Sequence, residues 1–276
     1  MDELCSFGHV ASTHDLLATG LSRRRLAAAV GSGRVLRASR GVYACSHLEA
    51  KPLAAARSGC RLDCVTALAQ RGVWSGIRPA GLHVRASPGR HLGALPAGAK
   101  VHWAAQHLPS DDPLAVSTVD ALLQAMRCLD RYDALACVES ALHVGELDAR
   151  ALRRLLELAP RWMRSGLSRL DRGAQSGLET HARLRLLDAG YRVRTQAHVP
   201  GASPVDLLVE ECVGVETDGE QFHAARFIAD RTKDIVIEGW GIRMLRIGAP
   251  HVFATWPETL ATIGRMVADA KRVPNG

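Results

Sequence analysis

Three acidic residues in the C-terminal third of the sequence, Asp206, Glu216 and Asp218, have a spacing that suits metal-ion chemistry. Residues 201–239 carry nine acids against three bases, although the whole chain has a formal net charge of +7. Because side chains alternate along a strand, Glu216 and Asp218 share one face, opposite the apolar residues between them. Asp206 lies just inside the preceding predicted strand, so strand pairing can bring its carboxylate beside Glu216.

Carboxylates gathered in this way repel one another unless a cation neutralises them. Their hard oxygen atoms suit Mg²⁺ or Mn²⁺. Such an ion polarises a phosphoryl oxygen and lowers the pKa of a bound water, which is the chemistry of phosphodiester hydrolysis. For a single acid, a solvated position at a strand end is the simpler explanation. An Asp followed ten residues later by Glu-x-Asp-Gly favours a site.

The elements that would position these acids follow the order α-β-β-β-α-β, which predicts an α/β domain. The expected helices cover residues 176–188 and 224–238. The expected strands cover residues 191–199, 205–210, 212–218 and 243–247.

Further residues complete a pattern with the acids: Glu179, Gln196, Val205-Asp206, Val215-Glu216-Thr217-Asp218-Gly219, His223, Asp230-Arg231-x-x-Asp234 and Gly239-Trp240. With this pattern, residues 176–252 resemble an actinobacterial group related to very short patch repair endonucleases, within the PD-(D/E)xK nuclease superfamily. The resemblance implies a restriction-endonuclease-like fold with Asp206 and Glu216 as metal ligands. It also implies that Glu179 orients or completes the site and that Gln196 lines it.

One position departs from the superfamily pattern, because Asp218 stands where the lysine of Glu-x-Lys is usual. His223, Arg231 or Lys233 could supply the missing cation. Each candidate also has a structural explanation. Glu179 fits a capping box at the start of its helix, His223 opens a helix, and Arg231 and Lys233 can pair with acids along their own helix.

The N-terminal residues form a basic arm with six arginines and no acid between residues 21 and 45: Arg23, Arg24, Arg25, Arg34, Arg37 and Arg40. Helices at 13–18 and 23–30, followed by strands at 34–38 and 41–44, are in the order of a winged helix-turn-helix. The first three arginines begin the recognition helix and the others lie on the wing, where they could contact DNA phosphates. The alternative is a solvated basic helix packed on a hairpin. This stretch also resembles the N-terminal domain of AbiEi-type antitoxins, which implies DNA binding.

Composition limits the classes of protein that fit. With 47% hydrophobic and 23% charged residues the chain is an ordinary globular protein, and 4% aromatic residues argue against a broad base-stacking surface. Seven cysteines without a C-x-x-C pair argue against a disulfide framework and a thiolate zinc site, which leaves free thiols in a reducing cytoplasm. No apolar run of about 18 residues and no signal-peptide pattern occur, so we expect a cytoplasmic protein without membrane contact.

Three domains are predicted: a winged helix-turn-helix at 1–48, a mixed α+β connector at 49–172 and a restriction-endonuclease-like domain at 173–276. The predicted function is an Mg²⁺- or Mn²⁺-dependent endonuclease acting on double-stranded DNA. Asp218 and His223 would manage the water or leaving group, while Gln196 would align the scissile phosphate or water. The alternative is a non-catalytic, antitoxin-like regulator with a degenerate nuclease fold and a cognate toxin as partner. An RNA-processing nuclease is a weaker third option, and a homodimer is compatible with each.

Overall fold

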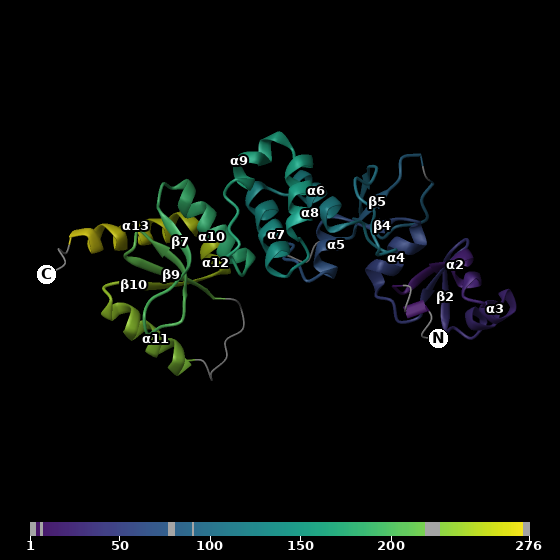
Figure 1. Ribbon diagram of the computed structural model, residues 1–276, viewed down its shortest axis with the longest axis horizontal. Helices are drawn as coiled ribbons and strands as arrows, with labels where there is room; N and C mark the ends of the chain where they lie inside the picture. Colours follow the sequence, from purple (N-terminus) through teal and green to yellow (C-terminus); the bar gives the residue numbers. More distant parts are fainter. Residues whose placement is uncertain (1–3, 6–7, 77–80, 90, 219–226, 273–276) are drawn as a thin grey trace. The chain divides into compact units, whose positions relative to one another are not determined.

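The computed structural model of the chain describes residues 4–5, 8–76, 81–89, 91–218 and 227–272, and for residues 218 and 227–232 it describes the backbone alone (Figure 1). The chain divides into two compact units. The first comprises Met1–Asp130 and Glu146–Arg164, and the second comprises Arg131–Gly145 and Ser165–Gly276. Helix α7 (Arg131–His143) therefore belongs to the second unit, although the sequence on either side of it belongs to the first.

The first unit begins with two helices and a small antiparallel sheet in the strand order β1-β3-β2. Its elements are β1 (Val10–Ser12), α2 (Thr13–Ala18), α3 (Arg23–Gly31), β2 (Val35–Ser39) and β3 (Val42–Cys45). Ser12 and Asp15 form a capping box at the start of α2, and the Ser22 hydroxyl accepts a hydrogen bond from the N–H of Arg25 at the start of α3. Helices α2 and α3 and strands β2 and β3 lie within one residue of the ranges expected from the sequence.

The rest of the first unit is a second three-stranded sheet with helices. It contains α4 (Ala50–Ser58), β4 (Arg61–Leu62), α5 (Cys64–Gln70), β5 (His83–Ala86), β6 (Lys100–Trp103), α6 (Thr118–Cys128), α8 (Ala149–Leu158) and the 3₁₀ turn η1 (Arg161–Met163), with α9 (Arg164–Leu167) at the boundary between the units. β4 is antiparallel to β5, and β5 is parallel to β6. Arg85 on β5 is buried with two carboxylates, lying 2.8 Å from Asp63 and 2.8 Å from Asp120. This part of the chain therefore combines a small sheet with helices.

The second unit is built on a four-stranded sheet in the order β10-β9-β8-β7. Its elements are α7, α10 (Gly177–Asp188), β7 (Val193–Ala197), β8 (Val205–Val209), β9 (Val213–Asp218), α11 (Phe227–Gly239), β10 (Arg243–Gly248), α12 (Ala249–Phe253) and α13 (Trp256–Arg272). β9 and β10 are parallel, and the other neighbouring pairs are antiparallel. The expected order α-β-β-β-α-β is the order found from α10 to β10. The two helices after β10 were not expected.

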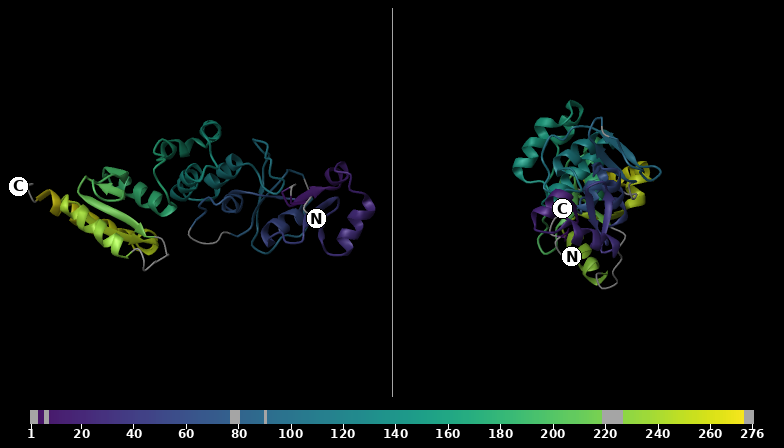
Figure 2. Two further views of the ribbon diagram at one scale, coloured as in Figure 1. Left: turned by 60° about the horizontal axis from the view of Figure 1, so that its bottom comes forward. Right: turned by 90° about the vertical axis from the view of Figure 1, so that its right-hand side faces the viewer.

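Apolar side chains cover both faces of this sheet. On one face, residues of α10, α12 and α13 pack against β8, β9 and β10, with Leu186, Val215 and Ile263 fully buried. On the other face, Ile237 of α11 packs against Leu208 of β8. The sheet is therefore a central layer between helices, as the ribbon of this unit shows (Figure 1 and Figure 2). One end of the sheet, where β7 and β9 end and β8 begins, holds the acidic residues.

Candidate functional site

Glu179, Gln196 and Asp206 form a continuous chain of contacts at this end of the sheet. The amide nitrogen Nε2 of Gln196 lies 3.2 Å from Oε1 of Glu179 and 3.4 Å from Oδ1 of Asp206. The pairing of Thr195 with Leu207 and of Ala197 with Val205 places Gln196 opposite Asp206. Helix α10 and two strands thus contribute one polar side chain each to the same place.

Glu179 is the most deeply buried of these residues, with 2% of its surface exposed. Its Oε2 accepts a hydrogen bond from the backbone N–H of Gln175 at 2.9 Å, and its own N–H donates to the Ser176 hydroxyl at 3.0 Å. Ser176 therefore caps the helix, while the Glu179 carboxylate also faces Gln196. Burial raises the pKa of the Glu179 carboxyl to about 7, with a smaller contribution from the negative charge of Asp206.

Asp206 and Glu216 lie on facing strands. Leu207 pairs with Val215 in the antiparallel β8–β9 ladder, so the next rung sets Asp206 opposite Glu216. Oδ2 of Asp206 accepts hydrogen bonds from the N–H of Thr217 at 2.9 Å and from its hydroxyl at 3.1 Å. The strand pairing expected from the spacing of the two acids is therefore present.

Glu216 is paired with two cations. Its Oε1 contacts Nζ of Lys233, and its Oε2 lies 3.3 Å from Nε of Arg246. Lys233 also donates to the carbonyl oxygen of Pro204 at 2.6 Å, and Arg246 also pairs with Asp234 at 2.8 Å. The salt bridge of Lys233 therefore crosses from α11 to β9. The sequence had left two partners open for Lys233: the acidic site, or an acid on its own helix.

Arg246 is not among the site residues predicted from the sequence. It stands opposite Glu216 in the parallel β9–β10 pairing, a register that the residues of the two strands alone do not specify. Asp218 ends β9 on the same strand as Glu216, but its side chain lies outside the described residues. All of His223 and the side chain of Arg231 lie outside them as well.

The donor atoms of the two facing acids fit a hard divalent cation. Magnesium is commonly held by one or two carboxylates with water completing its shell, and Asp206 and Glu216 supply two. In the described part of the chain, however, Glu179, Asp206 and Glu216 do not bring three ligand oxygens within 4.8 Å of one another. Lys233 and Arg246 already contact both oxygens of the Glu216 carboxylate, so a metal at Glu216 competes with these two cations.

The six N-terminal arginines are all exposed. No carboxylate of the described residues lies within ion-pair distance of any of them. Arg23 of α3 and Arg37 and Arg40 of the β2–β3 hairpin line one groove of about 500 Å³, which runs between the helix and the hairpin. A polyanion lying along this groove would therefore meet cations that no carboxylate of the described residues neutralises.

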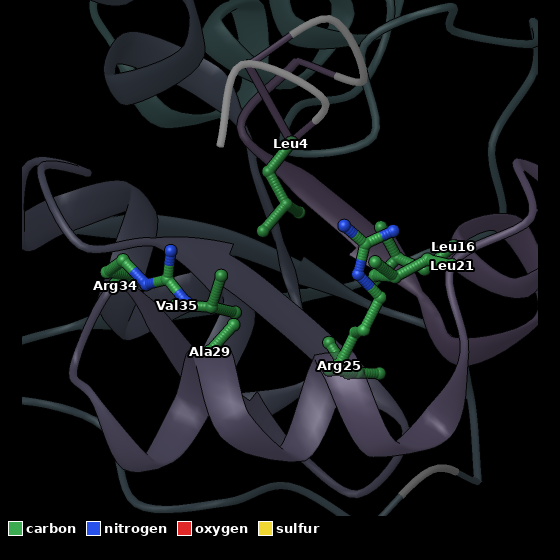
Figure 3. Close-up of a pocket in the computed structure, with 8 residues that line it drawn as sticks. Leu4, Leu16, Leu21, Arg25, Ala29, Arg34 and Val35 are labelled. Atoms are coloured by element: carbon green, nitrogen blue, oxygen red, sulfur yellow. The ribbon is translucent and has the colours of Figure 1, made fainter.

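A smaller hollow of about 200 Å³ lies on α3 (Figure 3). Leu4 faces the helix there, and its apolar lining includes Leu16 and Val35. Arg25 and Arg34 stand on either side of this apolar centre (Figure 3). The hollow belongs to the core that holds α3 on the sheet, since Leu4, Leu16 and Val35 are buried in one cluster.

In the described part of the chain, no helix combines the length and apolar character needed to cross a membrane. A comparison with curated proteins finds no match. Residues 1–45 match the family model described as "Transcriptional regulator, AbiEi antitoxin". This match confirms the resemblance expected for the N-terminal arm and extends over α2, α3, β2 and β3. The N-terminal part of the chain is therefore similar to the AbiEi antitoxins, a family of transcriptional regulators.

Proposed function

We propose that this chain is a DNA-acting protein whose N-terminal domain docks on duplex DNA and whose C-terminal domain is a divalent-metal-dependent endonuclease. One observation carries the nuclease assignment: Gln196 bridges Glu179 and Asp206 at the end of the sheet where Asp206 faces Glu216. Two acids on adjacent strands, an acid on the preceding helix and a nearby lysine are the residue types that phosphodiester hydrolysis requires.

The basic arm supports docking on duplex DNA. Three arginines begin α3, the second helix of a helix pair, and three more lie on or beside the hairpin that follows it. In winged helix-turn-helix proteins the second helix enters the major groove and the wing contacts the backbone. The similarity of residues 1–45 to a family of transcriptional regulators supports the same role.

The residues of the C-terminal site have distinct tasks in this proposal. Asp206 and Glu216 would hold Mg²⁺ or Mn²⁺, which when bound supplies polarisation of the phosphoryl oxygen and a more acidic water. Gln196 fixes the carboxylates of Glu179 and Asp206 relative to each other through its amide. Lys233 places a positive charge at Glu216 and could orient a phosphate there, the task of the lysine that Asp218 replaces.

A second candidate function is a DNA-binding regulator that does not cut, with a toxin as its partner. The ion pairs of Glu216 with Lys233 and Arg246 favour it, because they neutralise the acid without a metal. The family match at the N-terminus also favours it. On this alternative the C-terminal domain supports binding or assembly.

The deciding experiment is cleavage of supercoiled plasmid by the full chain with Mg²⁺ or Mn²⁺, with chelator as a blank and a gel-shift assay beside it. Asp206→Asn tests the site. Asp269→Asn is the matched control, because Asp269 is an acid of the same unit paired only at the surface with Arg243 and Arg272. Cutting by the parent and the control, but not by Asp206→Asn, supports the nuclease. Duplex binding without cutting in all three supports the regulator.

A further inference from the structure

Four side chains of the first unit bring two thiols and two imidazoles to one point. Cys64, His83, His102 and Cys128 each present one ligand atom, and all four atoms lie within 4.8 Å of one another. Nδ1 of His83 is 3.2 Å from Nε2 of His102, and that Nε2 is 3.9 Å from Sγ of Cys128. Two sulfur and two nitrogen ligands are a common set of structural zinc sites.

The separations match those that a tetrahedral ion imposes. Bonds of about 2.05 Å to nitrogen and about 2.3 Å to sulfur place two nitrogens about 3.3 Å apart, and a nitrogen and a sulfur about 3.6 Å apart. The His83–His102 separation of 3.2 Å and the His102–Cys128 separation of 3.9 Å are close to these values. The four atoms therefore need only small movements to surround one ion.

Four separate elements hold the ligands in place. Cys64 begins α5 and Cys128 ends α6, and these two helices pack together. His83 lies on β5 and His102 on the parallel strand β6. His102 pairs with Arg85, two residues after His83, so both imidazoles are on the same face of the sheet. A bound ion would therefore join the helix pair to the sheet.

Hydrogen bonds around the ligands restrict their orientation. The carboxylate of Asp63 accepts the N–H of Cys64 at 2.7 Å, and the backbone N–H of Asp63 donates to the carbonyl of His83 at 3.0 Å. The amide of Gln124 donates to Sγ of Cys128 at 3.4 Å. Donors to a ligating sulfur and partners of this kind behind the ligands are usual at metal sites.

We propose that Cys64, His83, His102 and Cys128 form a zinc site. Four protein ligands leave no position open for water or substrate, so the site is structural and locks α5 and α6 to β5 and β6. Cys64 and His83 are buried, while His102 and Cys128 are partly exposed and leave a path for the ion. The site lies in the first unit and uses none of the residues of the proposed nuclease site.

These ligands are too far apart in the sequence to form the C-x-x-C pattern by which a thiolate zinc site is usually predicted. A search for C-x-x-C pairs detects ligands that share one turn, whereas here each ligand comes from a different element. None of the seven cysteines, each within the described residues, forms a disulfide. A second group with the same ligand types, Cys5, His9, Cys45 and His47, also lies within 4.8 Å. Any measurement of bound metal must therefore separate the two groups.

The test uses the full chain carrying Cys5→Ser and Cys45→Ser, which removes the second group. Zinc content is measured by mass spectrometry after purification without chelator, and Co²⁺ is added to the metal-free protein as a spectroscopic probe. We expect a single zinc per chain and the visible absorption of tetrahedral Co²⁺ bound to thiolates. Adding Cys64→Ser or Cys128→Ser should abolish both. Cys60→Ser is the matched control, because Cys60 is a buried thiol of the same unit outside the cluster.

His102→Gln is a second test for the case in which the cysteine variants do not fold, because His102 is partly exposed and its replacement should leave the fold intact. This variant should fold and bind zinc more weakly by roughly a hundredfold or more. Removing zinc from the parent should lower its melting temperature by several degrees, and added zinc should restore it. The proposal is overturned by a parent that takes up no zinc or Co²⁺, by unchanged zinc content in Cys64→Ser, or by a Cys64–Cys128 disulfide in protein prepared from a reducing cytoplasm.

Discussion

The buried carboxyl of Glu179 should make the stability of the C-terminal unit depend on pH. Its pKa is raised from 4.5 to about 7, mainly because burial disfavours the charged form. Between these values the folded protein keeps a proton that the unfolded chain has lost, so the free energy of unfolding falls as pH rises through this window. At about 1.4 kcal/mol per pKa unit, the full loss is about 3 kcal/mol.

Urea denaturation of the full chain at about pH 5 and about pH 8, with chelator present, measures this effect. Glu179→Gln removes the titration but keeps an oxygen that can accept the N–H of Gln175. It should therefore show a smaller loss of stability between the two pH values than the parent. Glu238→Gln, at an exposed position on α11, is the control and should behave as the parent. Equal pH dependence in the parent and Glu179→Gln would refute the argument.

Three further predictions test other parts of the chain. Replacing all three arginines at 23–25 with alanine should weaken duplex binding. It should also reduce the slope of log K against log salt concentration by about 2 to 3, and an unchanged slope would show that α3 does not contact the DNA. Arg85→Met leaves two buried carboxylates without their cation and should cost about 3–5 kcal/mol by urea denaturation, so a loss under about 1 kcal/mol would contradict the buried network. Gly214→Ala adds a Cβ that overlaps Sδ of Met244, but the flexible, partly exposed Met244 side chain can move aside, so the variant should lose less than about 1 kcal/mol and a loss above about 3 kcal/mol would contradict this.

Local patterns were sufficient to predict the helices and strands of the basic N-terminal arm and those from α10 to β10 around the acidic site. Ser22 identifies the start of α3 because its hydroxyl caps that helix, and period-two alternation identifies β9. Helix α13 was missed although it is 17 residues long. Its apolar residues Leu260, Ile263 and Val267 recur at helical spacing and pack in one cluster, so the sequence pattern was sufficient to predict this helix.

Contacts between elements that are distant in the sequence could not be predicted from local patterns. Arg246 meets Glu216 only because β10 is parallel to β9, and strand order is not encoded in the residues of either strand alone. The same holds for Cys64 and Cys128, which are brought together by the packing of α5 on α6. In both cases the residue types were visible in the sequence, while their pairing depended on topology.

A metal was inferred from the sequence because clustered carboxylates need a cation to neutralise their charge, and the contacts of the acidic site weaken this inference. Gathered carboxylates need neutralisation, but the protein supplies much of it. Glu179 holds a proton more readily than an ordinary glutamate, Asp206 accepts hydrogen bonds from Thr217, and Glu216 is paired with Lys233 and Arg246. Clustering of acids alone therefore does not distinguish a nuclease from a regulator. The distinction depends on whether a divalent ion binds Glu216 in competition with these cations, because only then does the carboxylate become a metal ligand.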